Sequence, residues 1–268
     1  MRWAGGKSWL IKYLNDNASE IFSGTYHEPF LGGGSIFFHL KPQNAILSDA
    51  NGELIRTYEA IKRDVNKVIS ELAGFENTES CYYQVRSAKY RNDYKLAARF
   101  IFLNKTSFNG IYRVNLKGIY NVPYGYRSVP IFDRENLLSI SRLLQNVNLF
   151  EGDFSSHGDL IKKGDFIFLD PPYTVTHNNN GFIKYNQKLF SIEDQKRLSG
   201  FIDIIRKKKA FYFLTNAAHS IIDSIFDKGD FRVKIERASL IGGKKAVRGR
   251  YEEYIFTNLP AILKDTTY

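Results

Sequence analysis

A series of short apolar runs, separated by amphipathic stretches, most constrains the fold of this chain. Seven candidate runs, rich in branched and aromatic residues, lie at 25–30, 45–49, 148–153, 165–170, 210–216, 231–235 and 251–256. Runs of this length indicate strands, and their alternation with amphipathic segments is typical of a sheet packed against helices. The pattern predicts six or seven strands in an α/β fold with a Rossmann-like sheet.

The alternation is interrupted between the second and the third run. Residues 53–144 are rich in Lys, Arg, Tyr and Asn, and helical periodicity is evident at 53–72 and 93–103. We therefore predict two domains. An inserted, mainly helical domain occupies residues 53–144, and a sheet domain is assembled from residues 1–52 and 145–268.

The charge of the chain favours an anionic partner. A formal charge of +10 attracts polyanions at long range and gains from counterion release. Nucleic acid is the leading partner class, ahead of a membrane surface. Charge alone does not decide this, because many basic proteins have no nucleic-acid role. With 268 residues, 43% of them hydrophobic, the chain can form one sizeable core and a modest second module.

Cysteine, histidine and hydropathy patterns exclude several other classes. Cys81, the one cysteine, can form neither an internal disulfide nor a typical zinc set, and the five His residues lack ligand-like spacing. We expect no metal site. The N-terminal residues lack the apolar core of a signal peptide, and no run of about 18 apolar residues occurs. We expect a cytoplasmic protein that has access to intracellular DNA and no membrane partner.

A glycine-rich turn follows the first predicted strand. Gly32, Gly33 and Gly34 precede a helix-like segment at 36–40, and glycines in this place let a ligand approach the backbone at a helix N-terminus. The turn matches neither the complete dinucleotide pattern nor the Walker pattern, which argues against phosphate binding. A nucleotide-type pocket without a phosphate cradle suits S-adenosylmethionine.

Two further strand ends carry carboxylates. Asp49 ends the second predicted strand, where a carboxylate in a Rossmann-like sheet can accept hydrogen bonds from ribose hydroxyls. The alternative is a strand-end or helix-capping Asp, and the upstream glycines favour the ribose role. Asp153 and Phe154 follow the third run and offer an acceptor and a ring to the adenine of the cofactor, unless they form an ordinary turn.

The strand at 165–170 leads directly into Asp170-Pro171-Pro172-Tyr173. The two prolines remove two backbone donors and fix φ, so that Asp170 and the carbonyl after it are held at the carboxyl edge of the sheet. Open α/β sheets bind their ligands at this edge. The alternative, a structural Asp-Pro turn, does not explain why a buried strand delivers a carboxylate there.

Methylation of an adenine amino group needs this arrangement, because the lone pair of that nitrogen is delocalised into the ring. If Asp170 and the Pro171 carbonyl accept the two amino hydrogens, the nitrogen becomes more pyramidal and its developing positive charge is stabilised. Holding the reactants in line supplies further acceleration. Tyr173 would stack on the flipped base, a contact worth roughly 1–3 kcal/mol.

The insertion contains a stretch suited to DNA contacts. It runs from Asn104 to Arg113 and is followed by residues 121–125. Its Gly and Pro residues mark loops, and Asn and Arg side chains read adenine and guanine edges in the major groove. The alternative is a loop-rich helical subdomain packed with Tyr and Phe.

Two other segments are candidate loops. Residues 177–181, His-Asn-Asn-Asn-Gly, follow the Asp170 motif and have the composition of a mobile loop. Residues 241–250 form a basic loop before the last predicted strand. We predict contacts with DNA phosphates for this basic loop, and a solvated hairpin turn is the alternative.

Together, these motifs carry a family resemblance that covers nearly the whole chain. In order they are Trp3-Ala4-Gly5-Gly6-Lys7, Glu28-Pro29-Phe30 with Gly32 to Gly34, Asp49, and Asp170-Pro171-Pro172-Tyr173, around a central insertion. The chain resembles the Dam-type DNA adenine methyltransferases of the alpha group. The resemblance implies a Rossmann-like methyltransferase sheet, S-adenosylmethionine as cofactor, and an insertion that recognises the DNA target.

The resemblance also implies site residues. Cofactor contacts come from Trp3, Lys7, Asp49 and Asp170, with Phe30, Gly32 and Gly34 shaping the pocket. Residues 108–113 resemble the hairpin with which the family enters DNA. Phe108 is then the wedge, where the family often has Tyr, and Arg113 the guanine reader, with Asn109, Ile111 and Pro123 as further DNA contacts. The implied target is GATC in double-stranded DNA.

Alternative functions and partners stay open at this point. An RNA or small-molecule amino methyltransferase would use the same acceptors, and a DNA-binding protein with a degenerate site would keep the insertion. The order of the motifs and the size of the insertion argue against the first, and the complete Asp170 to Tyr173 motif argues against the second. Enzymes of this architecture act alone or beside a separate restriction endonuclease. We expect a monomer, since flipping one base at a time requires no dimer.

Overall fold

A computed structural model of the chain describes residues 3, 5–115, 117–174, 190–238 and 250–264. The loop at 177–181 and residues 241–249 of the basic loop lie outside the described residues. The chain divides into two compact units. Unit 1 comprises residues 1–11, 31–43 and 47–152, and unit 2 comprises residues 12–30, 44–46 and 153–268.

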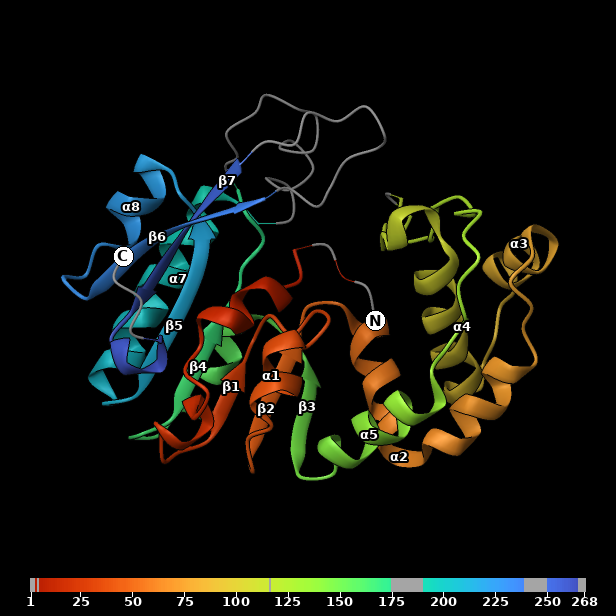
Figure 1. The fold of residues 1–268 in the computed structure, drawn as a ribbon, viewed down its shortest axis with the longest axis horizontal. Helices are drawn as coiled ribbons and strands as arrows, with labels where there is room; N and C mark the ends of the chain where they lie inside the picture. Colours follow the sequence, from red (N-terminus) through yellow and green to blue (C-terminus); the bar gives the residue numbers. More distant parts are fainter. Residues whose placement is uncertain (1–2, 4, 116, 175–189, 239–249, 265–268) are drawn as a thin grey trace. The chain divides into compact units, whose positions relative to one another are not determined.

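The described strands form one seven-stranded sheet in the order β3-β2-β1-β4-β5-β7-β6 (Figure 1). They are β1 (Tyr26–Glu28), β2 (Ala45–Asp49), β3 (Val147–Glu151), β4 (Phe166–Leu169), β5 (Phe211–Ala217), β6 (Phe231–Ala238) and β7 (Arg250–Thr257). β4 pairs in parallel with β1 and β5, whereas β7 is antiparallel to β5 and β6. All seven predicted strands are confirmed, in an α/β sheet whose order begins like that of doubly wound nucleotide-binding folds.

The helices include the two that periodicity predicted. α2 (Gly52–Ala73) and α4 (Asp93–Thr106) match the periodic segments, and α1 (Ser35–Leu40) matches the helix-like segment after the glycines. The others are α3 (Glu79–Ser87), α5 (Arg134–Leu144), α7 (Ile192–Lys207) and α8 (Ser220–Phe226). Short 3-10 helices are η1 (Ser8–Tyr13), η2 (Ala18–Glu20), η3 (Phe108–Gly110), η4 (Phe154–His157) and η5 (Pro260–Ile262).

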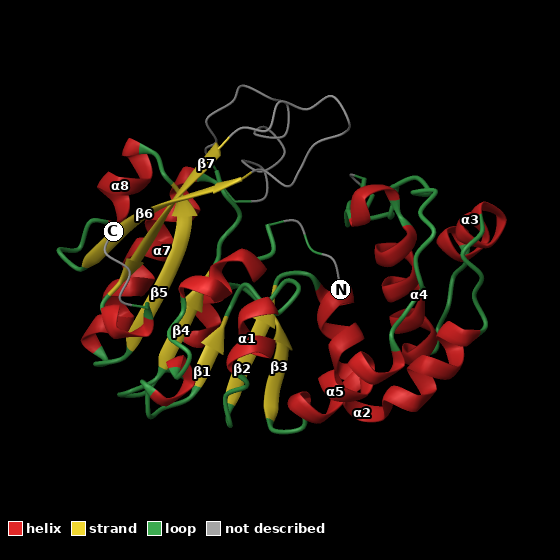
Figure 2. Ribbon diagram, viewed as in Figure 1, coloured by secondary structure: helices red, strands yellow, loops and turns green. Residues whose placement is uncertain are grey.

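Unit 1 is mainly helical between β2 and β3 (Figure 2). α2 packs against α4 and α5, and its buried face includes Leu54, Ile61 and Val68. The helix is interrupted at Asp64, which has non-helical φ and ψ of −160° and 90°. The Asp64 carboxylate accepts hydrogen bonds from the backbone N–H groups of Asn66 and Lys67, so it caps the second half of the helix.

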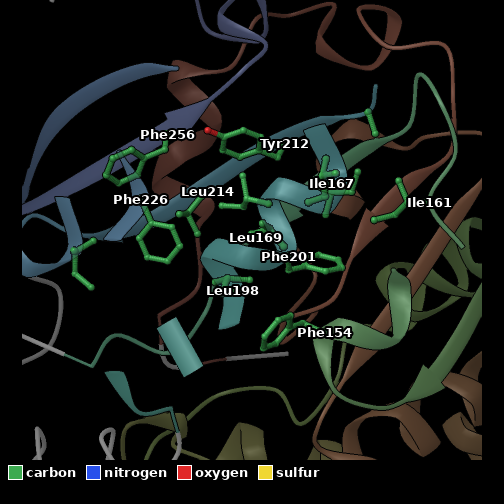
Figure 3. Packing of buried hydrophobic residues seen from close by; sticks show 14 of the residues in the cluster. Phe154, Ile161, Ile167, Leu169, Leu198, Phe201, Tyr212, Leu214, Phe226 and Phe256 are labelled. Atoms are coloured by element: carbon green, nitrogen blue, oxygen red, sulfur yellow. The ribbon is translucent and has the colours of Figure 1, made fainter. Parts of the chain in front are cut away.

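Unit 2 has a hydrophobic core between strands and helices. Leu169 of β4, Leu214 of β5 and Leu198 of α7 are fully buried and gather with Phe201 and Phe226 (Figure 3). α7 begins at a capping box in which Ser191 and Asp194 exchange hydrogen bonds between side chain and backbone. α7 covers the sheet face to which Leu169 of β4 belongs. The turn that follows β4 therefore starts from a rigid, buried strand.

A buried cluster of polar side chains joins β1, η4 and the start of β4. His27 Nε2 lies 3.1 Å from Asp165 Oδ2, and His27 Nδ1 lies 3.1 Å from His157 Nδ1. The Asp165 carboxylate also accepts hydrogen bonds from the backbone N–H groups of Thr25 and Lys162. A neutral His27 that donates to Asp165 accepts at Nδ1 from the Nδ1–H of His157, so the two rings need complementary tautomers. The described residues contain no group of three or more side chains placed to hold a metal ion.

This cluster predicts that stability falls in weak acid. Burial lowers the pKa of His27, and burial together with His27 lowers the pKa of His157 to about 3. Between that value and the unfolded pKa of about 6.5, the unfolded chain binds a proton that the folded chain does not, so stability rises with pH. From pH 6.5 to pH 5, His157 alone should cost about 2 kcal/mol of unfolding free energy.

Urea unfolding at several pH values measures this loss. His157→Asn keeps a polar group near the Nδ1 position but does not titrate, and it should flatten the pH dependence between about pH 5 and 6.5. The control is His39→Asn, because His39 is exposed at the end of α1. An unchanged slope in His157→Asn would show that the buried pair does not control acid stability.

Candidate active site and DNA-contacting segments

The glycine-rich turn of unit 1 has a conformation that favours glycine. Gly32 and Gly34 have φ of 47° and 65°. A Cβ atom on Gly32 would lie 2.6 Å from Cδ1 of the Trp3 indole, and one on Gly34 would lie 2.7 Å from the Phe38 ring. Strained φ and steric overlap therefore both exclude larger residues at Gly32. The Trp3 indole lies directly against this turn.

The Asp49 carboxylate holds the same turn. Its Oδ2 accepts a hydrogen bond from the Gly32 backbone N–H at 2.8 Å, and its Oδ1 accepts from the Asn51 N–H at 2.9 Å. Burial raises the pKa of Asp49, and these two donors oppose the rise. The cap of α2 is Asn51, which accepts from the Leu54 N–H, so Asp49 is not the helix cap. Asp49 ends β2, and its two hydrogen bonds give it the structural strand-end role that was the other alternative. Carboxylate oxygens with two lone pairs each can still accept ribose hydroxyls.

The N-terminal segment is tied to the helical part of unit 1. The half-buried Trp3 indole stacks on Tyr112, with ring centroids 5.8 Å apart, and on Phe100 at 6.4 Å. The Tyr112 hydroxyl donates to Glu53 Oε2 at 2.9 Å, and burial followed by Glu53 raises its pKa. Lys7 is buried, and its Nζ donates to the Gly5 carbonyl at 2.9 Å.

Gly32 provides a test of this turn. Gly32→Ala combines an unfavourable φ with overlap against Trp3, each worth about 1–3 kcal/mol, and should raise the Kd for S-adenosylmethionine at least tenfold. The matched control is Gly229→Ala, since Gly229 has φ of 71° and no atom within 4 Å of the place that a Cβ would take. Calorimetric titration gives both Kd values. Equal, small changes in the two variants would show that Trp3 does not constrain the turn.

Asp170 follows β4 in unit 2, as predicted. β4 is buried at all four positions, and Asp170 itself is half-buried. Its Oδ1 accepts a hydrogen bond from the Thr215 hydroxyl at 2.8 Å. Pro171 is buried and Pro172 is exposed, so the chain leaves the sheet immediately after Asp170.

Tyr173 is anchored through its hydroxyl. The Tyr173 hydroxyl donates to Glu253 Oε2 at 2.5 Å, and Glu253 is only 1% exposed. Burial, then the negative charges of Glu253 and Asp170, raise the pKa of Tyr173, which is therefore a neutral donor at physiological pH. Glu253 fixes the end of this ring.

A buried network also holds the backbone that follows. Gln195 Nε2 of α7 donates to the Thr174 hydroxyl at 2.9 Å and lies 3.4 Å from the Pro172 carbonyl oxygen. Its Oε1 accepts from Asn216 Nδ2 at 3.0 Å. Gln195, Asn216 and Thr174 are almost completely buried. Satisfied polar networks of this kind rigidify a local structure.

Phe30 and Phe154 lie together in unit 2. Their ring centroids are 5.6 Å apart, and Phe190 packs against both. Phe154 is only 2% exposed, whereas Phe30 is half-buried. Asp153 caps η4 through Ser155, and its Oδ1 lies 2.8 Å from Arg197 in a partly exposed ion pair. Asp153 thus has the local turn role that the sequence left as its alternative.

The two predicted DNA-contacting stretches lie side by side in unit 1. Ser107 forms an isolated antiparallel bridge with Tyr124, and the Phe108 N–H donates to the Pro123 carbonyl at 2.9 Å. A Cβ on Gly125 would lie 2.5 Å from the Ser107 carbonyl, so this approach requires glycine. Phe108 is 52% exposed, and Asn109 is exposed with φ of 57°.

A short hairpin follows these residues rather than coinciding with them. Residues 108–110 form the 3-10 turn η3, and the antiparallel bridge joins Val114 to Tyr120. Arg113 stands at its base, exposed, with Nε donating to Asn121 Oδ1 at 2.9 Å. Ile111 is half-buried, and its carbonyl accepts from the Tyr120 hydroxyl at 3.1 Å.

Comparison with known families decides the class of this chain. Residues 3–240 match the family described as D12 class N6 adenine-specific DNA methyltransferase. The chain belongs to this family. The predicted Dam-type resemblance is therefore confirmed, and the alternative of an RNA or small-molecule methyltransferase is excluded.

Three relatives of this methyltransferase cover between 81% and 98% of its length. It is 35% identical over 269 residues to the type II methyltransferase M1.LlaDCHI of Lactococcus lactis subsp. cremoris, covering 96% of this chain and 94% of the relative. It is 38% identical over 240 residues to the type II methyltransferase M.MjaIII of Methanocaldococcus jannaschii, covering 81% and 83%. It is 27% identical over 273 residues to the DNA adenine methylase of Escherichia coli K12, covering 98% and 96%.

The family establishes the reaction. This methyltransferase is an adenine-specific enzyme that uses S-adenosylmethionine as methyl donor and DNA as substrate. The alternative of a DNA-binding protein with a degenerate site is not supported, since the enzyme family covers the complete Asp170 to Tyr173 motif. None of the described helices has both the length and the apolar character needed to span a lipid bilayer.

The residues present in this methyltransferase fit S-adenosylmethionine. Asp49 offers carboxylate acceptors beside a glycine turn that leaves room for no side chain at Gly32. The Trp3 indole lies against this turn and adds an aromatic ring to the same unit. Acceptors for hydroxyls and rings for a purine are the chemistry that a nucleoside with no phosphate requires.

Several side chains around the Asp170 motif were not found by sequence reasoning. Thr215 and Asn216 end the apolar run of β5, and Glu253 interrupts the apolar pattern of β7. Polar residues directly after an apolar run were a usable signal for Thr215 and Asn216, because a strand of that composition is expected to be buried. Gln195 lies on an amphipathic helix whose polar residues are mostly exposed, so its sequence carried no comparable signal.

Proposed function

We propose that this adenine-specific methyltransferase extrudes its target adenine from duplex DNA and methylates it within GATC. The observation that carries the proposal is the Asp170 to Tyr173 turn, in which a carboxylate and an aromatic ring are both fixed by partly buried hydrogen bonds. A base inside a duplex cannot present its amino group to such a turn, so the enzyme must take it out of the stack.

Asp170 and the Pro171 carbonyl are the proposed acceptors of the two amino hydrogens. Accepting both makes the nitrogen more pyramidal and directs its lone pair away from the ring. S-adenosylmethionine supplies the methyl group as an electrophile from its sulfonium. As the N–CH3 bond forms and the bond from the methyl group to sulfur breaks, the Asp170 carboxylate stabilises the positive charge on the adenine nitrogen and then accepts the surplus proton, which it releases to solvent.

Tyr173 is the proposed platform for the extruded base. A stacked base gains about 1–3 kcal/mol from an aromatic ring, which offsets part of the few kcal/mol that extrusion costs. The bond to Glu253 holds the ring at its far end, so the ring loses little freedom when the base arrives. Pro172 fixes the backbone between the acceptors and the platform.

Cofactor contacts are proposed residue by residue. In unit 1, Asp49 accepts ribose hydroxyls, Trp3 and the turn at Gly32 and Gly34 shape the pocket, and Lys7 orders the N-terminal segment. In unit 2, Phe30 contacts the adenine of the cofactor. Asp153 and Phe154 act on that contact indirectly, since Phe154 supports the Phe30 ring and Asp153 begins η4.

Target recognition is proposed for residues 53–144. Phe108 wedges into the base stack, which suits its 52% exposure, and Arg113 reads a guanine edge. Asn109, Ile111 and Pro123 complete the contact surface because hydrogen bonds and the bridge to Tyr124 hold both stretches together. The net charge of +10 supplies affinity for duplex DNA.

We further propose that the enzyme acts as a monomer on intracellular DNA, as one extruded base needs one active site. Two of the relatives are type II methyltransferases. A separately acting restriction endonuclease that recognises the same sequence is therefore the expected partner in the cell.

Methyl transfer from labelled S-adenosylmethionine to plasmid DNA tests the function. Label should appear in adenine, and nucleases blocked by, or dependent on, adenine methylation in GATC should change their cleavage accordingly. Label in adenine without altered GATC cleavage would reject the target and keep the reaction. Comparing duplexes that carry 2-aminopurine at the target position tests extrusion, because its fluorescence rises when it leaves the stack.

Arg113→Ala tests the reader separately. Loss of a bidentate guanine contact should lower the preference for GATC over single-mismatch sites by about 5- to 150-fold. Arg91→Ala is the control, because Arg91 is an exposed arginine of residues 53–144 and a lost phosphate contact weakens all sites equally. Retained preference in Arg113→Ala would assign guanine recognition to another side chain.

A further inference from the structure

Thr215 stands beside the catalytic turn because of strand register. β4 and β5 are parallel, with Leu169 opposite Leu214, so the next residues along each strand, Asp170 and Thr215, also face each other. Opposite residues of paired strands share a face of the sheet. Thr215 therefore belongs to the sheet face of Phe168 and Phe213, away from the leucine core under α7.

The contact between these two side chains is short and partly buried. The Thr215 hydroxyl donates to Asp170 Oδ1 at 2.8 Å, and Thr215 is 0% exposed. Threonine in a strand has a restricted χ1, so its hydroxyl is held in one direction by the backbone. A hydrogen bond from a rigid donor to a carboxylate fixes the rotation of that carboxylate about its Cβ–Cγ bond.

We propose that Thr215 is a positioning residue that orients the Asp170 carboxylate toward the adenine amino group. The inference rests on the proposed role of Asp170 as an acceptor. A carboxylate that rotates freely presents its lone pairs in many directions, and only some of these accept a hydrogen from the reacting nitrogen. Thr215 also stabilises the ionised form of Asp170, which is the form that accepts the hydrogen bond.

Thr215→Val and Thr215→Ser form the test. Valine has nearly the shape of threonine but no hydroxyl, whereas serine keeps the hydroxyl. Thr215→Val should lower kcat at saturating substrates by about 10- to 100-fold, with KM for S-adenosylmethionine and Kd for DNA changed less than about twofold. Thr215→Ser should restore kcat to within about threefold of wild type, since its donor remains.

The pH profile separates positioning from a packing defect. Thr215→Val removes a hydrogen-bond donor to the Asp170 carboxylate, so the acidic limb of kcat should move to higher pH in Thr215→Val and stay in place in Thr215→Ser. If Thr215→Val does not fold, Thr215→Ala measured against Thr215→Ser gives the same comparison. Thermal unfolding of each variant identifies any loss of folded protein.

Asp170→Ala, measured in parallel, tests the role of Asp170 separately from the role of Thr215. An active Asp170→Ala enzyme would reject the role of Asp170 itself. An inactive Asp170→Ala enzyme together with wild-type kcat and pH profile in Thr215→Val would overturn only the inference about Thr215. Equal losses in Thr215→Val and Thr215→Ser would also overturn it, because the hydroxyl would then not matter.

Discussion

Replacing Asp170 by alanine is expected to lower kcat for methyl transfer by about 100- to 1,000-fold, the usual loss when one fixed charge-stabilising group is removed. The variant should still bind duplex DNA, since residues 53–144 are unaltered. Tritium transfer to a GATC duplex at saturating S-adenosylmethionine measures kcat, and gel shift measures binding. Buried contacts of the strand before Asp170 are unchanged, so the fold should persist.

Asp170→Asn refines this expectation. Asparagine keeps one carbonyl acceptor in place but lacks the negative charge that stabilises the reacting nitrogen, so its kcat should lie between those of Asp170→Ala and wild type. Near-wild-type kcat in Asp170→Asn would show that hydrogen-bond geometry, not charge, is the main contribution. Wild-type kcat in Asp170→Ala would reject Asp170 as an acceptor altogether.

Tyr173→Ala is expected to lower kcat/KM for DNA by about 5- to 150-fold, which corresponds to the loss of one base–aromatic stack. A stability loss should accompany it, because Glu253 is buried and loses the phenol that donates to it. With 2-aminopurine at the target position, the rise in fluorescence on binding should be smaller than for wild type.

Tyr173→Phe separates the ring from its anchor. It keeps the stacking surface, so kcat/KM should fall less than about tenfold, while the hydrogen bond to Glu253 is lost. A second change, Glu253→Gln in the Tyr173 enzyme, leaves an acceptor for the hydroxyl and should be milder still. Equal losses in Tyr173→Phe and Tyr173→Ala would contradict stacking as the function of the ring.

Local signals in the sequence were sufficient for the elements that position the site. Each strand is a short apolar run between turn residues, so all seven were predicted, although several of their ends differ by a few residues. The Asp170 motif was found because prolines stop a buried strand abruptly. α2 and α4 were found because their apolar faces repeat at helical spacing over several turns.

Contacts that depend on register or on distant segments could not be predicted in this way. Thr215 meets Asp170 only because Leu169 pairs with Leu214, a pairing that no spacing along the chain specifies. The Tyr173–Glu253 bond joins residues 80 positions apart. Asp49 was expected to face a ligand. Its carboxylate also accepts a hydrogen bond from the Gly32 N–H and so holds the glycine turn, a contact that no sequence pattern indicates.

The stack of Trp3 on Tyr112 connects a proposed cofactor contact to the residue before Arg113, the proposed guanine reader, within unit 1. Tyr112 lies between Ile111 and Arg113 in the chain, and Trp3 lies against the Gly32 turn. If S-adenosylmethionine orders Trp3, it also restricts the residues next to Arg113. Thermodynamic reciprocity then requires that cognate DNA tighten the cofactor by the same factor. Such an enzyme would discriminate best between DNA sequences when S-adenosylmethionine is bound. The cofactor concentration in the cell would then affect its sequence preference as well as its rate.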